Sequence, residues 1–112
     1  MSAMAQHRPA AWATLEQALR RRVPVRARYH NLERVLCPHA LGWKNGRAKL
    51  LAYQADGTSR GGISADPRQR WRSLFVDEIQ DATIIDGTWQ TAQNYSHQTN
   101  GIDHIEIKVP VY

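Results

Sequence analysis

The hydrophobic pattern of this chain changes its period near Pro24, and this change constrains the fold more than any other feature of the sequence. Before Pro24, Trp12, Leu15 and Leu19 recur at steps of three and four residues, which places them on one face of a helix. The surrounding Ala, Leu, Glu, Gln and Arg residues also favour helix. The pattern therefore predicts one short helix over residues 9–22, which ends before the proline.

Beyond this point apolar and polar residues alternate. Val25, Ala27 and Tyr29 alternate with Arg26 and Arg28, which is the period of a strand with one apolar and one basic face. Further segments along the chain also have a composition and pattern typical of β-strands. The strands predicted in this way are residues 23–29, 34–43, 47–54, 71–76, 80–85 and 105–111.

The order of these segments limits the sheet to an antiparallel one, because parallel strands need crossover helices and none follows the first helix. Asn45-Gly46 predicts a tight hairpin between the second and third strands. Pro38 indicates an edge or a bend, and residues 77–79 one helical turn. The prediction is a mainly β domain, a small, strongly bent, five-stranded antiparallel barrel with the helix over one end. The C-terminal strand is an addition that pairs within the domain or with a second copy.

The length of 112 residues suits a single domain. We expect a flexible leader over residues 1–9, the helix and barrel over 10–87, and a C-terminal extension over 88–112 that carries the terminal strand. No apolar run is long enough for a membrane helix, and the N-terminus lacks the apolar stretch of a secretory signal. The single cysteine, Cys37, cannot form an internal disulfide. These features predict a cytoplasmic protein that does not associate with membranes.

Charge is distributed unevenly around a net value of +5. Residues 1–72 contain 14 Lys and Arg against 4 Asp and Glu, whereas residues 73–112 contain 1 against 6. One interpretation is that the basic part binds a polyanion. The alternative is that the two parts face each other in the fold and neutralise one another.

Catalytic motifs are absent from the sequence. It has no Gly-rich phosphate loop, nucleophile elbow or His-Glu-x-x-His motif, so we predict that the protein is not an enzyme. Cys37 and His39 form only half of a zinc site, since zinc normally takes four ligands. The acidic cluster of Asp77, Glu78 and Asp81 is typical of a solvated turn. No metal or cofactor is therefore predicted.

Basic and aromatic residues on the predicted strands give a stronger signal. Small barrels bind single-stranded nucleic acid or nucleotides with Arg and Lys on the phosphates and aromatic rings stacked on the bases. Tyr53 is the candidate for stacking, and five basic residues are candidates for the phosphates. The predicted ligand site consists of Arg26, Arg28, Arg34, Lys49, Tyr53 and Arg72. The alternative is that the aromatic residues form the core and the arginines a solvated outer face.

Several short motifs occur in an order that resembles a known family. They are Arg34-Val-Leu-Cys-Pro-His-Ala-Leu41, Gly46, Leu50-Leu-Ala-Tyr53 and Trp71-Arg-Ser-Leu-Phe-Val-Asp-Glu-Ile79. Over residues 12–86 this order is similar to the WYL domain of bacterial regulators. The resemblance implies an Sm-like, SH3-type barrel that senses a ligand, with nucleic acid or nucleotide-like molecules as the expected class. It also implies a role in transcription regulation, here as a stand-alone module.

Two motifs depart from the family pattern. The Trp-Tyr-Leu triplet that names the family falls on Ala48-Lys49-Leu50, and its Asp-Arg-Ile motif reads Asp77-Glu78-Ile79. Arg34 and Arg72 do match family positions. The leading hypothesis is therefore a ligand-sensing module for single-stranded nucleic acid or a nucleotide. The alternative is a protein–protein or self-assembly module that forms a homodimer through residues 101–112.

Overall fold

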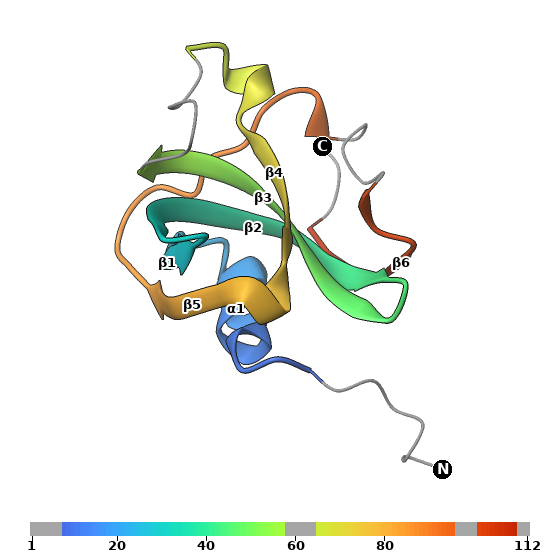
Figure 1. Ribbon diagram of the computed structural model, residues 1–112. Helices are drawn as coiled ribbons and strands as arrows, with labels where there is room; N and C mark the ends of the chain where they lie inside the picture. Colours follow the sequence, from blue (N-terminus) through green and yellow to red (C-terminus); the bar gives the residue numbers. More distant parts are fainter. Residues whose placement is uncertain (1–7, 58–64, 96–100, 110–112) are drawn as a thin grey trace.

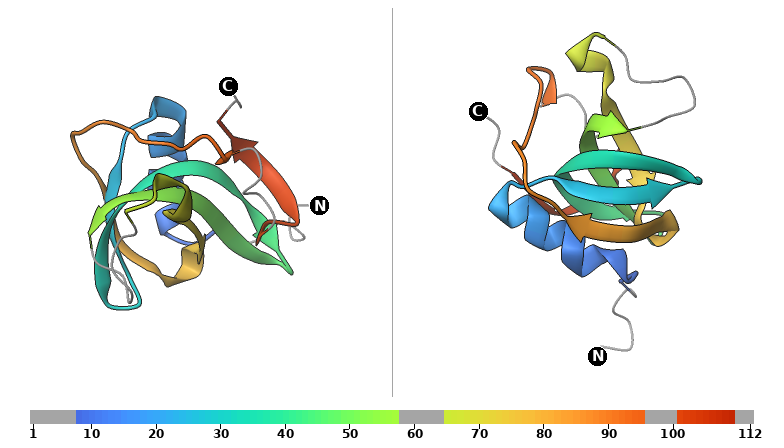
Figure 2. Two further views of the ribbon diagram at one scale, coloured as in Figure 1. Left: turned by 90° about the horizontal axis from the view of Figure 1, so that it is seen from above. Right: turned by 90° about the vertical axis from the view of Figure 1, so that its left-hand side faces the viewer.

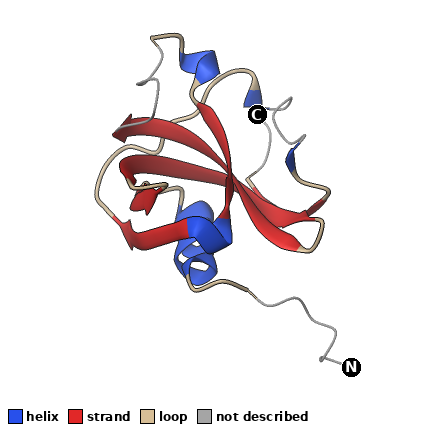
Figure 3. Cartoon of the chain, in the orientation of Figure 1, coloured by secondary structure: helices blue, strands red, loops and turns tan. Residues whose placement is uncertain are grey.

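The computed structural model describes residues 8–57, 65–95 and 101–109 (Figure 1). One helix, α1 (Ala11–Arg21), precedes a six-stranded antiparallel sheet (Figure 3). Two short 3-10 turns, η2 (Pro67–Gln69) and η3 (Val76–Glu78), flank the fourth strand. The strands are β1 (Val25–Tyr29), β2 (Leu32–Lys44), β3 (Arg47–Gly57), β4 (Trp71–Phe75), β5 (Ile79–Ile84) and β6 (His104–Lys108).

Helix α1 forms where the helical period predicted it. Trp12, Leu15 and Leu19 are all buried on one face, which confirms the periodic pattern. The helix ends at Arg22, whose backbone has a left-handed φ of 55° and whose N–H donates to the Leu19 carbonyl. Such a left-handed residue is a common helix ending. Pro24 follows and cannot continue the helix.

Tight turns fix the two long hairpins of the sheet. His30 and Asn31 join β1 to β2 with φ values of 52° and 63°. Asn45 and Gly46 join β2 to β3 with φ values of 50° and 80°. Positive φ at both central residues matches the right-handed twist of paired strands, so the predicted Asn-Gly hairpin is confirmed.

Strand β2 is long and bent, and it pairs with three other strands. Its first part pairs with β1 and its last part with β6, while β3 pairs with it along most of its length. The register with β3 shifts between Val35 and Leu36 and again between Pro38 and Ala40. Such bulges bend a strand, so the bend predicted at Pro38 is confirmed.

The sheet is open, which corrects the prediction of a closed five-stranded barrel. Its order is β4-β3-β2-β1-β5, and β6 joins β2. In the described part of the chain no ladder joins β4 to β5, the two ends of this order. Turn η3 links them instead, and the backbone N–H of Phe75 donates to the hydroxyl of Tyr29 on β1 at 3.2 Å. The Sm-like or SH3 type of the barrel is therefore not established.

The two faces of the sheet are covered by different segments. Helix α1 packs against β2 and β5 (Figure 2), on the inner face of the sheet, which we define by Trp43, Leu50 and Leu74. The Trp12 ring of the helix stacks on Trp43. Residues 88–95 cover the opposite, outer face. Strand β6 then pairs with β2 of the same chain, which confirms the additional C-terminal strand. Residues 1–7 of the expected leader and 110–111 of the expected last strand lie outside the described residues.

Candidate anion-binding site

Arg34 and Arg72 lie on the inner face of the sheet, among the core residues. Arg34 on β2 pairs with Ala27, and Arg72 on β4 pairs with Ala52. Both of these alanines are buried, and side chains of directly paired residues share one face of a sheet. Arg34 is only 7% exposed, although Arg is among the residues found buried least often.

The Arg34 guanidinium has few partners in this position. Its Nη1 lies 3.4 Å from the Oε1 of Gln54, at the long limit of a hydrogen bond. Its Cζ lies 5.3 Å from the ring centroid of Tyr29, as in a cation–π contact. Its Nε is buried without any hydrogen-bond partner, the one such side-chain atom among the described residues. A buried donor without a partner costs free energy.

Arg72 completes a pair of like charges. Its Nη1 donates to the backbone carbonyls of Gln69 and Trp71, at 3.1 and 3.0 Å. Burial lowers the pKa of Arg34, and the nearby charge of Arg72 lowers it further. Burial also lowers the pKa of Arg72. None of the ion pairs between described residues includes either arginine.

The arrangement is complementary to an anion. The two neighbouring guanidinium groups form no ion pair with a described carboxylate and so create a positive field, and an uncompensated charge is costly at the buried Arg34. A bound phosphate or carboxylate would compensate both charges and accept the free N–H of Arg34. Guanidinium forks match these two groups in geometry.

Arg26 and Arg28 lie elsewhere. They alternate with the buried residues of β1, so their side chains point away from the inner face, and both are exposed. Arg28 forms an ion pair with Asp81 of β5 at 3.4 Å. The structure thus confirms that they share one strand face and separates that face from Arg34 and Arg72.

Lys49 and Tyr53 lie on the outer face, opposite the arginine pair. The Tyr53 ring is 2% exposed and packs edge-on against Trp71, with centroids 5.3 Å apart. The Lys49 Nζ lies 4.0 Å from the ring centroid of Phe75, and burial lowers the pKa of this lysine. Of the six predicted site residues, the structure therefore brings together only Arg34 and Arg72.

Gln54 and Tyr29 were not predicted as part of the site. Both are buried, and both contact the guanidinium of Arg34. The period-two pattern of β3 could have indicated Gln54, because this polar residue stands two positions after the buried Ala52. Tyr29 stands on the apolar side of its strand and carries no comparable signal.

Cys37 and His39 do not form the metal-ligand pair that their spacing suggested as one option. His39 is fully buried, and its Nδ1 donates to the backbone oxygen of Cys37 at 2.7 Å. Its Nε2 lies 2.9 Å from the hydroxyl of Thr91, and its ring stacks on Trp89. Burial lowers the pKa of His39 to about 4. Within residues 8–57, 65–95 and 101–109, no group of three metal-ligating side chains is found.

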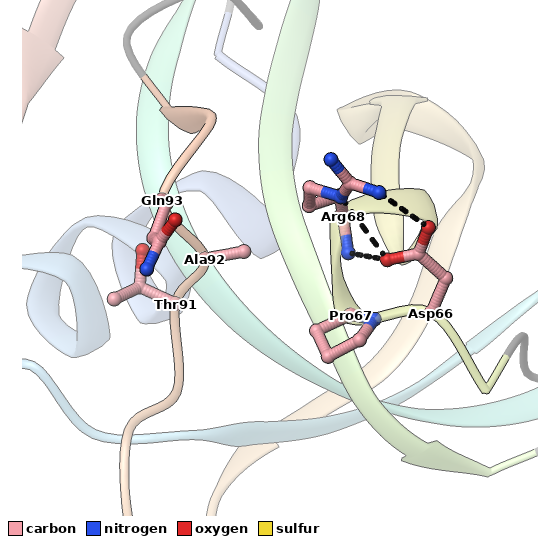
Figure 4. A pocket seen from close by; sticks show the side chains of 6 residues that line it. All are labelled: Asp66, Pro67, Arg68, Thr91, Ala92 and Gln93. Atoms are coloured by element: carbon pink, nitrogen blue, oxygen red, sulfur yellow. Dashed lines mark hydrogen bonds and ion pairs between the residues drawn. The ribbon is translucent and has the colours of Figure 1, made fainter.

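A pocket of about 570 Å³ lies between η2 and the segment that covers the outer face (Figure 4). Its lining residues are Asp66, Pro67, Arg68, Thr91, Ala92 and Gln93. Arg68 and Asp66 form an ion pair at 3.2 Å, so the two charges in the pocket compensate each other. The pocket includes none of the predicted site residues, and the arginine pair remains the stronger candidate for an anion site.

Comparisons with known proteins agree with the motif order. The family model of the WYL domain matches residues 10–84. No curated protein and no solved structure matches the chain. Within the described residues, no helix has the length and apolar character needed to cross a membrane. With about two thirds of its length matched by the family model, the chain belongs to the WYL domain family.

Proposed function

We propose that this protein is a non-enzymatic regulatory module that senses single-stranded nucleic acid or a nucleotide-like anion through Arg34 and Arg72. WYL domains are linked to ligand sensing in regulators. One observation carries the proposal: the buried Nε of Arg34 has no hydrogen-bond acceptor, while a second arginine adds its charge nearby. A protein retains such a costly arrangement where a ligand supplies the missing acceptor and the missing charge.

The proposal assigns a role in ligand binding to four of the six predicted residues and none to the other two. Arg34 and Arg72 contact the anion, with Gln54 and Tyr29 holding the guanidinium of Arg34. The exposed Arg26 and Arg28 attract anions from a distance, which raises the association rate. Lys49 and Tyr53 have no direct contact with the ligand here, because both side chains are buried on the outer face.

The proposal is tested by fluorescence anisotropy with labelled single-stranded and duplex oligonucleotides of one sequence. We expect single strands to bind more tightly at near-physiological salt. An Arg72→Ala variant should lose at least about tenfold in affinity, because a charge-assisted hydrogen bond contributes roughly 1.5–3 kcal/mol. Arg21→Ala is the matched control, since it removes one exposed positive charge from α1 and lies outside the site. Equal affinity of the Arg72→Ala variant and the parent would refute the assignment.

A second candidate function is self-assembly through β6. This strand pairs with β2 on one side, and its other edge has no partner among the described strands. A free edge can add a strand from a second copy. Sedimentation velocity over a range of protein concentrations should then show a reversible dimer. A monomer at every concentration would exclude this candidate.

A further inference from the structure

We infer that the Arg34–Arg72 site takes a terminal phosphate monoester, carried by a mononucleotide or by the end of a single strand, and not an internal phosphodiester. The inference deepens the proposed function and rests on it. Two properties of the site support the inference: its two positive charges and the burial of Arg34.

The charge of the site matches a monoester. Arg34 and Arg72 together provide two positive charges, and no described carboxylate forms an ion pair with either. A phosphate monoester carries a charge of about −1.5 to −2 at pH 7, whereas each linkage of a strand carries a single negative charge. A diester would leave one of the two arginines uncompensated in a region where burial already lowers the pKa of both. Full compensation therefore favours the monoester.

The depth of the site excludes a strand that passes across it. Arg34 is 7% exposed, and its Nε has almost no contact with solvent. The ring of Tyr29 and the side chain of Gln54 lie against the same guanidinium. An internal phosphate is flanked by a sugar on each side and stays at the surface of the protein. A terminal phosphate is linked on one side only, so its three free oxygens can enter and reach the buried N–H.

The experiment compares single-stranded oligonucleotides of one sequence that differ only at their ends. Four labelled probes carry a 5′-phosphate, a 3′-phosphate, both hydroxyl ends, or no ends at all, as a circle of the same sequence. We expect the probe with a phosphate at the recognised end to bind at least about tenfold more tightly than the probe with two hydroxyl ends. This is the gain from one hydrogen bond to a charged group. The circular probe should bind as weakly as the hydroxyl probe.

Competition identifies the source of the monoester. Adenosine monophosphate and inorganic phosphate are titrated against the 5′-phosphorylated probe. The concentration of adenosine monophosphate that displaces the probe is compared with that of an unlabelled phosphorylated strand. If the two concentrations are similar, the site is assigned to a mononucleotide. Displacement only by the phosphorylated strand assigns it to a strand end.

The possible failures can be told apart. If all four probes bind equally well, the end-specific inference is overturned and the proposed function remains. If none of the probes binds and direct titration with adenosine monophosphate shows no binding either, the proposed function is overturned together with the inference. In an Arg72→Ala variant with an unchanged circular dichroism spectrum, the preference for the phosphorylated end should disappear, while Arg21→Ala should retain it. A preference that survives Arg72→Ala would place the phosphate elsewhere. Arg72→Gln provides the same comparison should the alanine variant fail to fold.

Discussion

The Arg34 guanidinium is buried beside a like charge, and its Nε has no hydrogen-bond partner among the described residues, so we expect it to lower the stability of the fold. Replacing buried charges with apolar residues of similar volume is often neutral or stabilising by about 1–4 kcal/mol. We therefore predict that Arg34→Met raises the free energy of unfolding by about 1 kcal/mol and abolishes ligand binding. Urea denaturation measures the first effect and anisotropy the second. A lower stability of the variant would show that Arg34 acts mainly as a structural residue.

His39 makes the stability of the domain depend on pH. The backbone oxygen of Cys37 only accepts hydrogen bonds, so the neutral ring carries its proton on Nδ1 and Nε2 accepts from Thr91. The pKa falls from 6.5 to about 4 on folding, so the unfolded chain binds more protons between these values. Stability is therefore complete above pH 6.5 and decreases as pH falls toward 4, by about 3 kcal/mol.

This acid sensitivity can be separated from that of the carboxylates. The Arg47 guanidinium lowers the pKa of Asp77, and His30 with Arg47 lowers that of Glu78, so their contributions are lost below about pH 4.5. Thermal denaturation between pH 7 and pH 5 should therefore report mainly on His39. A His39→Gln variant should show a much flatter pH dependence in this window. A parent protein with constant stability over the window would contradict the assignment.

The arginine pair shows how far sequence reasoning reaches at the level of single residues. The alternation of residues along 71–76 predicts that Arg72 and Leu74 share one face of the strand, and the pairing of β3 with β4 confirms this. The face that carries Arg34 follows from the unbroken register of β1 with β2, in which Arg34 lies opposite the buried Ala27. Their proximity depends on the registers of three strands, and no local pattern in the sequence specifies those registers.

At the scale of secondary structure, local signals predicted most elements. The helix, the Asn-Gly hairpin and the helical turn near residue 77 each depend on neighbouring residues, and each is present. The covering of the outer face was not predicted. Residues 88–95 are mostly polar, and Trp89 and Tyr95 show no period, yet both rings pack against His39. Their role depends on contacts with distant strands, which composition does not reveal.

Gly42 lies on β2 where the C-terminal strand β6 pairs with it. A Cβ atom at this position would lie 2.2 Å from the backbone oxygen of His104 and 2.5 Å from Cγ2 of Ile102. Neither distance is compatible with packed atoms, so the segment around β6 would have to move. We predict that Gly42→Ala lowers the free energy of unfolding by about 1–3 kcal/mol, the usual cost of overpacking.

Hydrogen exchange tests whether the effect of Gly42→Ala is local. The backbone N–H groups of residues 103 and 109 donate to β2 in the parent protein and should lose protection in the variant. The pairing of β1 with β2 should keep its protection, because it lies at the other end of β2. Unchanged exchange at both ends would show that the crossing tolerates a methyl group.

At the scale of the whole molecule, part of the uneven charge along the chain is compensated by ion pairs within the fold. Among the residues that the structure describes, four groups of ion pairs connect the basic part, residues 1–72, with the acidic part, residues 73–112. They join Arg8 to Glu106, Arg28 to Asp81, Lys44 to Asp103, and Arg47 to Asp77 and Glu78. This supports the alternative that the two parts neutralise each other. Exposed pairs of this kind contribute little stability, so they orient the surface charge more than they hold the fold together.

The salt dependence of binding therefore distinguishes a deep site from a basic surface. For single strands the logarithm of affinity falls with the logarithm of salt concentration by about 0.7 for each neutralised phosphate. Contact of one phosphorylated end with Arg34 and Arg72 predicts a shallow slope of about −0.7 to −1.4, which anisotropy at several salt concentrations measures. A groove that follows the strand along β1, with Arg26 and Arg28 on two further phosphates, would give a steeper slope of about −2.1 to −2.8. A slope in this steeper range would place the ligand on the exposed arginines of β1 instead of the inner face. A shallow slope together with end preference would leave Arg34 and Arg72 as the source of affinity.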